Sequence, residues 1–233
     1  MAYVAANRPV AIATVNNAVT VPLRTYVFTH SIVMKGIIFS LTLVAGILLL
    51  AGCSSEPDSN GLAEEINNQR IENASENTPE AKAATSKNDQ KDVAEYMVDL
   101  ADISLAKHVM SLLAIKRSVH PAVQVYAHET VQQEDEERQR LNAQGQQYKI
   151  TLPSTLSNTS QLMVAKLEEQ KTGADFDSYY LSYIAELNDS AISKAQNLIK
   201  NTDKPALAGF FENLIATDEL HMKKATDLKK SIN

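Results

Sequence analysis

Two residues near the end of the chain have the types and spacing of metal ligands. Asp218 and His221 are three positions apart, so on a helix their side chains lie on one face. An acid-x-x-His pair is half of the di-iron carboxylate signature, which also needs a second such pair and two more carboxylates. The second pair is missing here. Glu134, at an inward position on another predicted helix, completes a partial site whose ligand types suit one iron, zinc or manganese ion.

Two further polar residues point inward by the helical period. Asp102 and Asn188 fall on the apolar lines of their segments, and we interpret them as members of the same inner polar layer. The alternative to a metal site is that these groups hydrogen-bond one another or reach solvent at a helix edge. The sequence leaves both interpretations open and names no cofactor firmly.

The chain lacks the common motifs of nucleophilic and phosphoryl-transfer enzymes. It contains no Gly-x-Ser-x-Gly elbow and no phosphate-binding loop. Its one cysteine, Cys53, belongs to a processing motif described below. The residues therefore favour a protein that is not an enzyme.

Amphipathic segments must position the polar layer. From residue 91 onward, apolar residues recur every three or four positions, which predicts helices. Pro121 and Pro205 begin two of the long segments, and Asp175 is expected to cap another. A shorter helix is expected over about 158–171, and no segment has a strand pattern. Residues 91–233 are thus predicted to form an all-α domain, an antiparallel four-helix bundle with a short extra helix.

The segment that ends at Cys53 has the layout of a secretory signal peptide. Met34 and Lys35 precede an apolar run over residues 37–50, and Leu-Ala-Gly-Cys occupies residues 50–53. This ending resembles the lipobox of bacterial lipoproteins, in which the cysteine is acylated after cleavage. The run is shorter than the ~20 apolar residues of a membrane-spanning helix. Residues 34–53 are therefore interpreted as a lipoprotein signal peptide with Cys53 as the lipidation site, rather than as a retained anchor.

The segments on either side of the signal peptide are not expected to fold. Residues 1–33 have no acidic residue and no helical period, and we interpret them as an upstream extension from a mis-assigned start. Residues 54–90 are rich in Glu, Asn, Ser and Ala, which predicts a flexible tether because few apolar groups are available to offset ordering. The alternative for part of the tether is a short helix over residues 62–71.

The charge of the chain argues against nucleic-acid binding. The sequence has 28 acidic and 22 basic residues, with a formal net charge of −6. Three of the bases and none of the acids lie in residues 1–53, so the remainder is more acidic still. Binding to phosphates requires clustered Lys and Arg. The basic residues of the last segment are instead expected to complement its helix dipole.

Three short motifs carry a family resemblance over residues 92–228. They are the run His-Pro-Ala-Val-Gln-Val-Tyr-Ala at residues 120–127, Phe176-Asp177 followed by Tyr180, and Leu220-His221. In this order they resemble the ferritin-like domain of unknown function 4142, a family often labelled as predicted outer-membrane proteins. Many bacterial members resemble this chain in carrying an export signal.

The resemblance also implies positions for the polar layer. The family pattern has a glutamate in the first helix and histidines in the second, third and fourth. The corresponding positions here hold Lys107, Glu134, Asn188 and His221, so only His221 matches the pattern.

Together these observations predict a lipid-anchored envelope protein. We expect it at the outer membrane, facing the periplasm, with a bundle that binds an envelope partner or has a structural role. The alternative is a ferritin-like metal-binding or oxidase-type protein that uses Glu134, Asp218 and His221.

Overall fold

The computed structural model describes residues 58–74 and 87–232 of the chain. All regular secondary structure in these ranges is helical, which confirms the all-α prediction. Residues 1–33, the signal peptide over 34–53 and Cys53 lie outside the described residues. The described helices are α1 (Ser59–Glu72), α3 (Lys87–Arg117), α4 (Pro121–Tyr148), α5 (Asn158–Glu168), α6 (Ala174–Asn201) and α7 (Pro205–Ile232).

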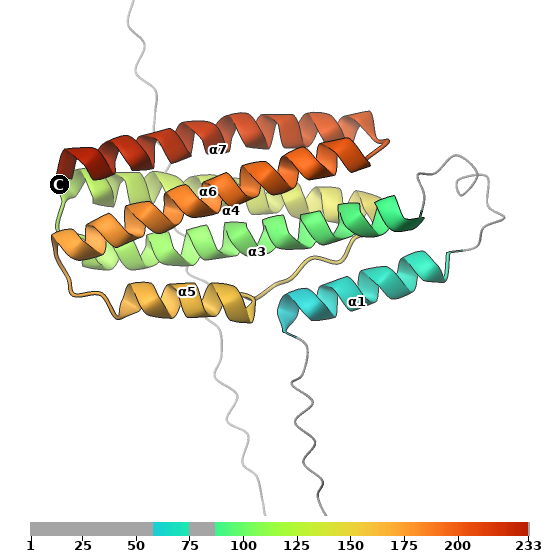
Figure 1. Ribbon diagram of the computed structural model, residues 1–233, viewed down its shortest axis with the longest axis horizontal. Helices are drawn as coiled ribbons and strands as arrows, with labels where there is room; N and C mark the ends of the chain where they lie inside the picture. Colours follow the sequence, from blue (N-terminus) through green and yellow to red (C-terminus); the bar gives the residue numbers. More distant parts are fainter. Residues whose placement is uncertain (1–57, 75–86, 233) are drawn as a thin grey trace, which may run out of the picture. The chain divides into compact units, whose positions relative to one another are not determined.

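The four long helices α3, α4, α6 and α7 form a bundle (Figure 1). Residues 118–120 join α3 to α4 and residues 202–204 join α6 to α7, and turns this short make each pair antiparallel. Helix α3 packs along α4 and α6, and α6 packs along α7, but α4 and α7 contact each other only sparsely. The bundle is therefore most open along the seam between α4 and α7.

The ends of the long helices follow from local chemistry. Pro121 occupies the first turn of α4, where its missing N–H leaves no hydrogen bond unmade. At the other end of α4, Lys149 adopts a left-handed conformation and the Ile150 N–H donates to the Gly145 carbonyl at 2.7 Å. A Cβ at Gly145 would lie 3.0 Å from the Ile150 oxygen, so a larger residue there would crowd the chain reversal.

The predicted cap of α6 is wrong. Its N-cap is Gly173, with a φ of 134°, and Asp175 lies inside the first turn. A side chain in that position contributes through its charge near the helix N-terminus rather than by capping.

The core of the bundle contains large aromatic and aliphatic side chains. Tyr126, Phe176, Tyr180 and Phe211 are fully buried, and burying one large apolar side chain contributes about 1.5–3 kcal/mol. Buried polar residues lie among them, and the largest of these is Lys107. The core thus surrounds a polar centre with apolar material.

Part of the predicted tether is folded. Helix α1 covers Ser59–Glu72 and packs on α3, with Ala63 and Ile71 buried. The Asn67 side chain donates to the Thr151 carbonyl at 2.9 Å and accepts from the Thr151 N–H at 2.7 Å. The helix expected as an alternative over residues 62–71 is therefore present and longer, Ser59–Glu72. The hydrogen bonds between the buried Asn67 side chain and the Thr151 backbone add to its few apolar contacts.

Candidate functional site

A buried lysine lies at the centre of the bundle. The Lys107 side chain on α3 has no exposed surface. Its Nζ lies 2.8 Å from Glu134 Oε1 on α4 and 2.9 Å from Asp218 Oδ1 on α7. It also donates a hydrogen bond to Asn188 Oδ1 on α6 at 3.2 Å. Each of the four long helices thus supplies a polar group to one centre.

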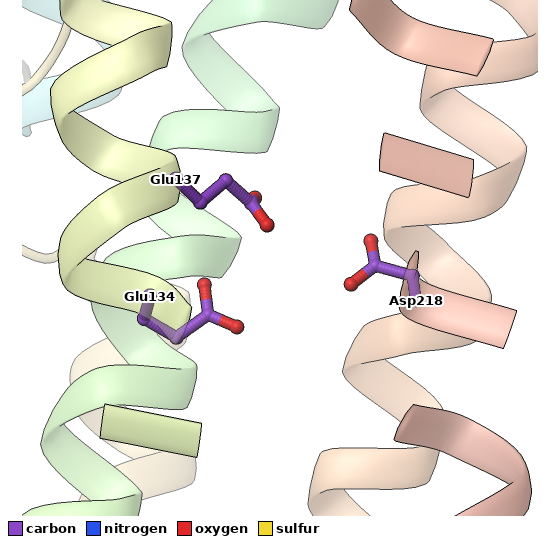
Figure 2. A group of neighbouring side chains, drawn as sticks. All are labelled: Glu134, Glu137 and Asp218. Carbon is purple, nitrogen blue, oxygen red and sulfur yellow. The ribbon is translucent and has the colours of Figure 1, made fainter. Parts of the chain in front are cut away.

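A third acid, Glu137, belongs to the same centre. Ligand oxygens of Glu134, Glu137 and Asp218 all lie within 4.8 Å of one another, and the three residues are buried. Glu134 and Glu137 are one turn apart on α4, so they share a face. Figure 2 shows both pointing toward Asp218, which approaches from α7. We refer to Lys107, Glu134, Glu137, Asn188 and Asp218 as the Lys107 cluster.

The charges of the Lys107 cluster perturb one another strongly. Burial alone would lower the pKa of Lys107, but the surrounding carboxylates, led by Glu134, outweigh it and hold that pKa well above its ordinary value. Burial raises the pKa of Glu134, and it raises the pKa of Glu137 to about 8. The ammonium therefore stays charged, and the cluster has more acidic groups than cations to pair with them.

Several polar atoms of the cluster have no hydrogen-bond partner among the described residues. They are Glu134 Oε2, Asp218 Oδ2 and Asn188 Nδ2. The Lys107 ammonium pairs with Glu134 and Asp218, and no ion pair within the described part of the chain reaches Glu137. Buried polar groups without partners are uncommon and costly. Two of these three atoms, Glu134 Oε2 and Asp218 Oδ2, are carboxylate oxygens, which are the ligands that hard divalent cations prefer.

A cavity leads from the surface to Glu137. Its volume is about 370 Å³, and it lies along the sparse seam between α4 and α7. The lining includes the Glu137 and Arg140 side chains of α4 and the Leu214, Thr217 and Leu220 side chains of α7. Among the three acids of the Lys107 cluster, Glu137 is the one that lines this cavity.

The structure brings together three of the residues predicted from the sequence. Glu134, Asn188 and Asp218 all contact Lys107. His221 is not in the carboxylate group. It is partly buried, and its ring centroid lies 5.9 Å from that of Tyr126. Its carbonyl accepts a hydrogen bond from the Tyr126 hydroxyl at 3.1 Å, and burial lowers the pKa of its imidazole.

Asp102 lies in a separate polar contact. Its Oδ1 accepts from the Ser157 N–H at 2.8 Å, and its Oδ2 accepts from the Ser157 and Ser160 hydroxyls at 2.7 Å each. Ser157 is the N-cap of α5. Asp102 therefore anchors the start of α5 to α3.

Sequence reasoning missed Glu137 and the central position of Lys107. The helical spacing of the sequence could have indicated both residues. Lys107 follows Ile103 and precedes Met110 in the apolar line of α3, and a lone lysine in such a line must find a buried partner. Glu137 is three residues after Glu134, the spacing that places two side chains on one face.

The comparison with protein families identifies the chain. A family model described as "Domain of unknown function (DUF4142)" matches residues 75–228. The chain belongs to DUF4142. This confirms the family that the three sequence motifs indicated, and the matched range contains the whole Lys107 cluster of this DUF4142 protein.

The comparisons with curated proteins and with solved structures add no function to the family assignment. No curated protein matches the DUF4142 chain. A crystal structure of a conserved hypothetical protein from Mycobacterium tuberculosis is similar with a TM-score of 0.48 and 10% sequence identity, over 62% of this chain and 99% of that chain. Among the described helices, none is both long and apolar enough to cross a membrane.

Proposed function

We propose that this DUF4142 protein is a lipid-anchored protein of the bacterial envelope, with a helical bundle that has a binding or structural role. The anchor rests on the Leu-Ala-Gly-Cys pattern at residues 50–53. The role of the bundle rests on one observation, the wholly buried Lys107 paired with Glu134 and Asp218. A charged group held in this way links α3, α4 and α7 and fixes how the helices pack.

The anchor is tested by substituting the cysteine. In a bacterial host, we expect the wild-type protein to partition with membranes and into detergent, and Cys53→Ala to lose both properties, because the lipid supplies the membrane affinity. The matched control is Ser54→Ala, which changes the next residue and leaves the thiol intact. Detergent partitioning of Cys53→Ala equal to that of wild type would contradict the proposal.

The membrane that holds the anchor is a separate part of the proposal. We place it in the outer membrane, facing the periplasm. Ser54 follows Cys53, where an aspartate is associated with retention in the inner membrane. Separation of the two membranes by density should recover the protein with the outer membrane, and Ser54→Asp should move it to the inner one. Recovery of the wild type with the inner membrane would refute this location.

A second candidate function is divalent metal binding at Glu134, Glu137 and Asp218. It is favoured by the convergence of the three carboxylates (Figure 2) and by the two spare oxygens of Glu134 and Asp218. The ligand types predicted from the sequence allowed iron, zinc or manganese. A set made only of oxygen atoms suits manganese best among these, since zinc and iron are more often bound with imidazole or thiolate.

Metal analysis tests the second function. We expect the protein, purified without chelator, to contain close to one metal ion per chain by mass spectrometry, and Asp218→Asn to lose it. Glu136→Gln is the control, since Glu136 neighbours Glu137 but is exposed. The absence of metal from the wild-type protein, even after incubation with Mn²⁺, would leave the binding or structural role alone.

A further inference from the structure

Glu134 and Asp218 each use only one of their two carboxylate oxygens. Lys107 Nζ contacts Glu134 Oε1 at 2.8 Å and Asp218 Oδ1 at 2.9 Å. The other oxygens, Glu134 Oε2 and Asp218 Oδ2, have no hydrogen-bond partner within 3.5 Å among the described residues, and the Ser104 hydroxyl lies close enough to Glu134 to act against the rise of its pKa. A carboxylate held in this way has one side facing a cation and one side free to face another.

The surroundings of Lys107 Nζ are those of a bound cation. Three oxygen atoms from three helices lie within 2.8–3.2 Å of it, namely Glu134 Oε1, Asn188 Oδ1 and Asp218 Oδ1. Carboxylate and amide oxygens are the groups that hold hard metal ions in proteins. The ammonium thus lies among oxygen atoms of the types that also bind metal ions.

A second set of oxygens lies beside the first. It consists of the spare oxygens of Glu134 and Asp218 and the Glu137 carboxylate, which points toward Asp218 in Figure 2. Glu137 also lines the cavity of about 370 Å³ along the α4–α7 seam. The second set therefore includes the one acid of the cluster that lines this cavity, whereas the three oxygens around Lys107 Nζ belong to residues that do not line it.

We infer that Lys107 is a built-in cation that fills the first of two adjacent cation positions, so that the Lys107 cluster takes one divalent ion, at the second position. This inference rests on the metal-binding function proposed above and deepens it by naming the position and the number of ions. One ammonium and one divalent ion together match the charge of three ionised carboxylates. A second divalent ion is excluded in the wild type because the Lys107 ammonium already occupies its place.

Four proteins separate the two positions. They are wild type, Glu137→Gln, Lys107→Gln and the double variant Lys107→Gln/Glu137→Gln. Glu137→Gln removes a ligand of the second position, and Lys107→Gln vacates the first. The double variant removes one positive and one negative group, so it keeps the charge balance of the wild type and leaves only the first position usable. Glu136→Gln again serves as the control.

The measurement is the number of Mn²⁺ ions bound per chain, by equilibrium dialysis with metal analysis. We expect one ion in wild type and in Glu136→Gln, and two in Lys107→Gln. Affinity in Glu137→Gln should fall by at least about tenfold, since even groups outside the ligand set contribute that much. The double variant should bind one ion again. Electron paramagnetic resonance should show isolated Mn²⁺ in wild type and magnetically coupled Mn²⁺ in Lys107→Gln.

Each outcome bears on the inference. If Lys107→Gln binds one ion and the double variant binds none, Lys107 does not occupy a cation position and the inference is overturned, while metal binding by the wild type stands. If the wild type binds none, the metal-binding function fails, yet one ion in the double variant would still show that Lys107 stands in a cation position. If none of the four proteins binds Mn²⁺, both the metal-binding function and the inference about Lys107 are overturned. Circular dichroism with and without Mn²⁺ checks that each variant folds. If Lys107→Gln does not fold, the number of ions bound by the double variant decides whether Lys107 occupies a cation position.

Discussion

Helix α3 takes part in two buried polar centres, one at Asp102 and one at Lys107, and they are built differently. Both oxygens of Asp102 accept hydrogen bonds, from one backbone N–H and two hydroxyls. The Lys107 cluster has a fully buried ammonium, three acids and two carboxylate oxygens without partners. In the first centre, neutral donors hydrogen-bond both oxygens of the carboxylate. The second centre has three carboxylic acids and one ammonium, so its acids outnumber its cations.

The difference indicates what each centre is for. A buried carboxylate that accepts hydrogen bonds from neutral donors at both oxygens needs no further ligand, so Asp102 has a structural role. An excess of buried acid costs free energy unless a cation or a proton neutralises it. The Lys107 cluster is therefore the part of this DUF4142 protein where charge, pH and metal ions should have effects that Asp102 does not share.

The largest expected effect comes from removing the ammonium. Lys107→Met keeps a long apolar stem but leaves three acids without a cation, and we expect the free energy of unfolding near neutral pH to fall by about 3–5 kcal/mol, as for other broken buried ion pairs. Urea denaturation with a chelator present measures this change. A loss below about 1 kcal/mol would mean that the cluster does not depend on its ammonium.

A smaller effect is expected at the other centre. Asp102→Ala leaves three donors of Ser157 and Ser160 unsatisfied, and we expect a loss of about 2–3 kcal/mol. Hydrogen exchange should increase mainly in α5, and Mn²⁺ binding should not change. Asp99→Ala, one turn earlier on α3, is the control, because its ion pair with Lys194 is partly exposed and contributes only about 0–1 kcal/mol. Equal losses in the two variants would contradict the role given to Asp102.

Per unit of pH, the smallest effect is the dependence of stability on pH. The pKa of Glu137 is raised from 4.5 to about 8 in the folded protein, so between these values the folded state binds more protons than the unfolded state. The stability that protonated Glu137 contributes is present below about pH 4.5 and is lost as the pH rises toward 8. We expect the free energy of unfolding to fall across this window by up to about 1.4 kcal/mol per pH unit.

Glu137→Gln isolates the contribution of this group. The variant should flatten the pH dependence and raise stability at pH 8 relative to wild type, since a neutral amide replaces a buried charge. Asp102→Ala should retain the slope, because the two centres are separate. The comparison requires denaturation curves across the pH range in the presence of a chelator. A wild-type slope that persists in Glu137→Gln would assign the effect to another group, with Glu134 as the first candidate because burial raises its pKa too.

Several features of the fold could be predicted because they depend on local sequence. Pro121 begins α4 where a proline is favoured, and Pro205 begins α7. The apolar period predicted the long helices, and it also directed Glu134, Asn188 and Asp218 inward, where the structure places them. The prediction that Asp175 caps α6 was wrong, because the helix begins earlier, with Gly173 as its N-cap. Helix α1 was predicted only as an alternative, because the partner of Asn67, the Thr151 backbone, lies 84 residues away and local sequence does not reveal such a contact.

The sequence by itself determined the helical class, the family and the inward direction of most polar residues, because period, caps and motifs are local properties. Only the tertiary structure decided which of those residues meet. It placed Lys107, rather than His221, between Glu134 and Asp218, and it added Glu137 from the same face of α4. The physical reason is that the register of four packed helices sets which side chains share a centre, and that register depends on how all the apolar faces fit together at once.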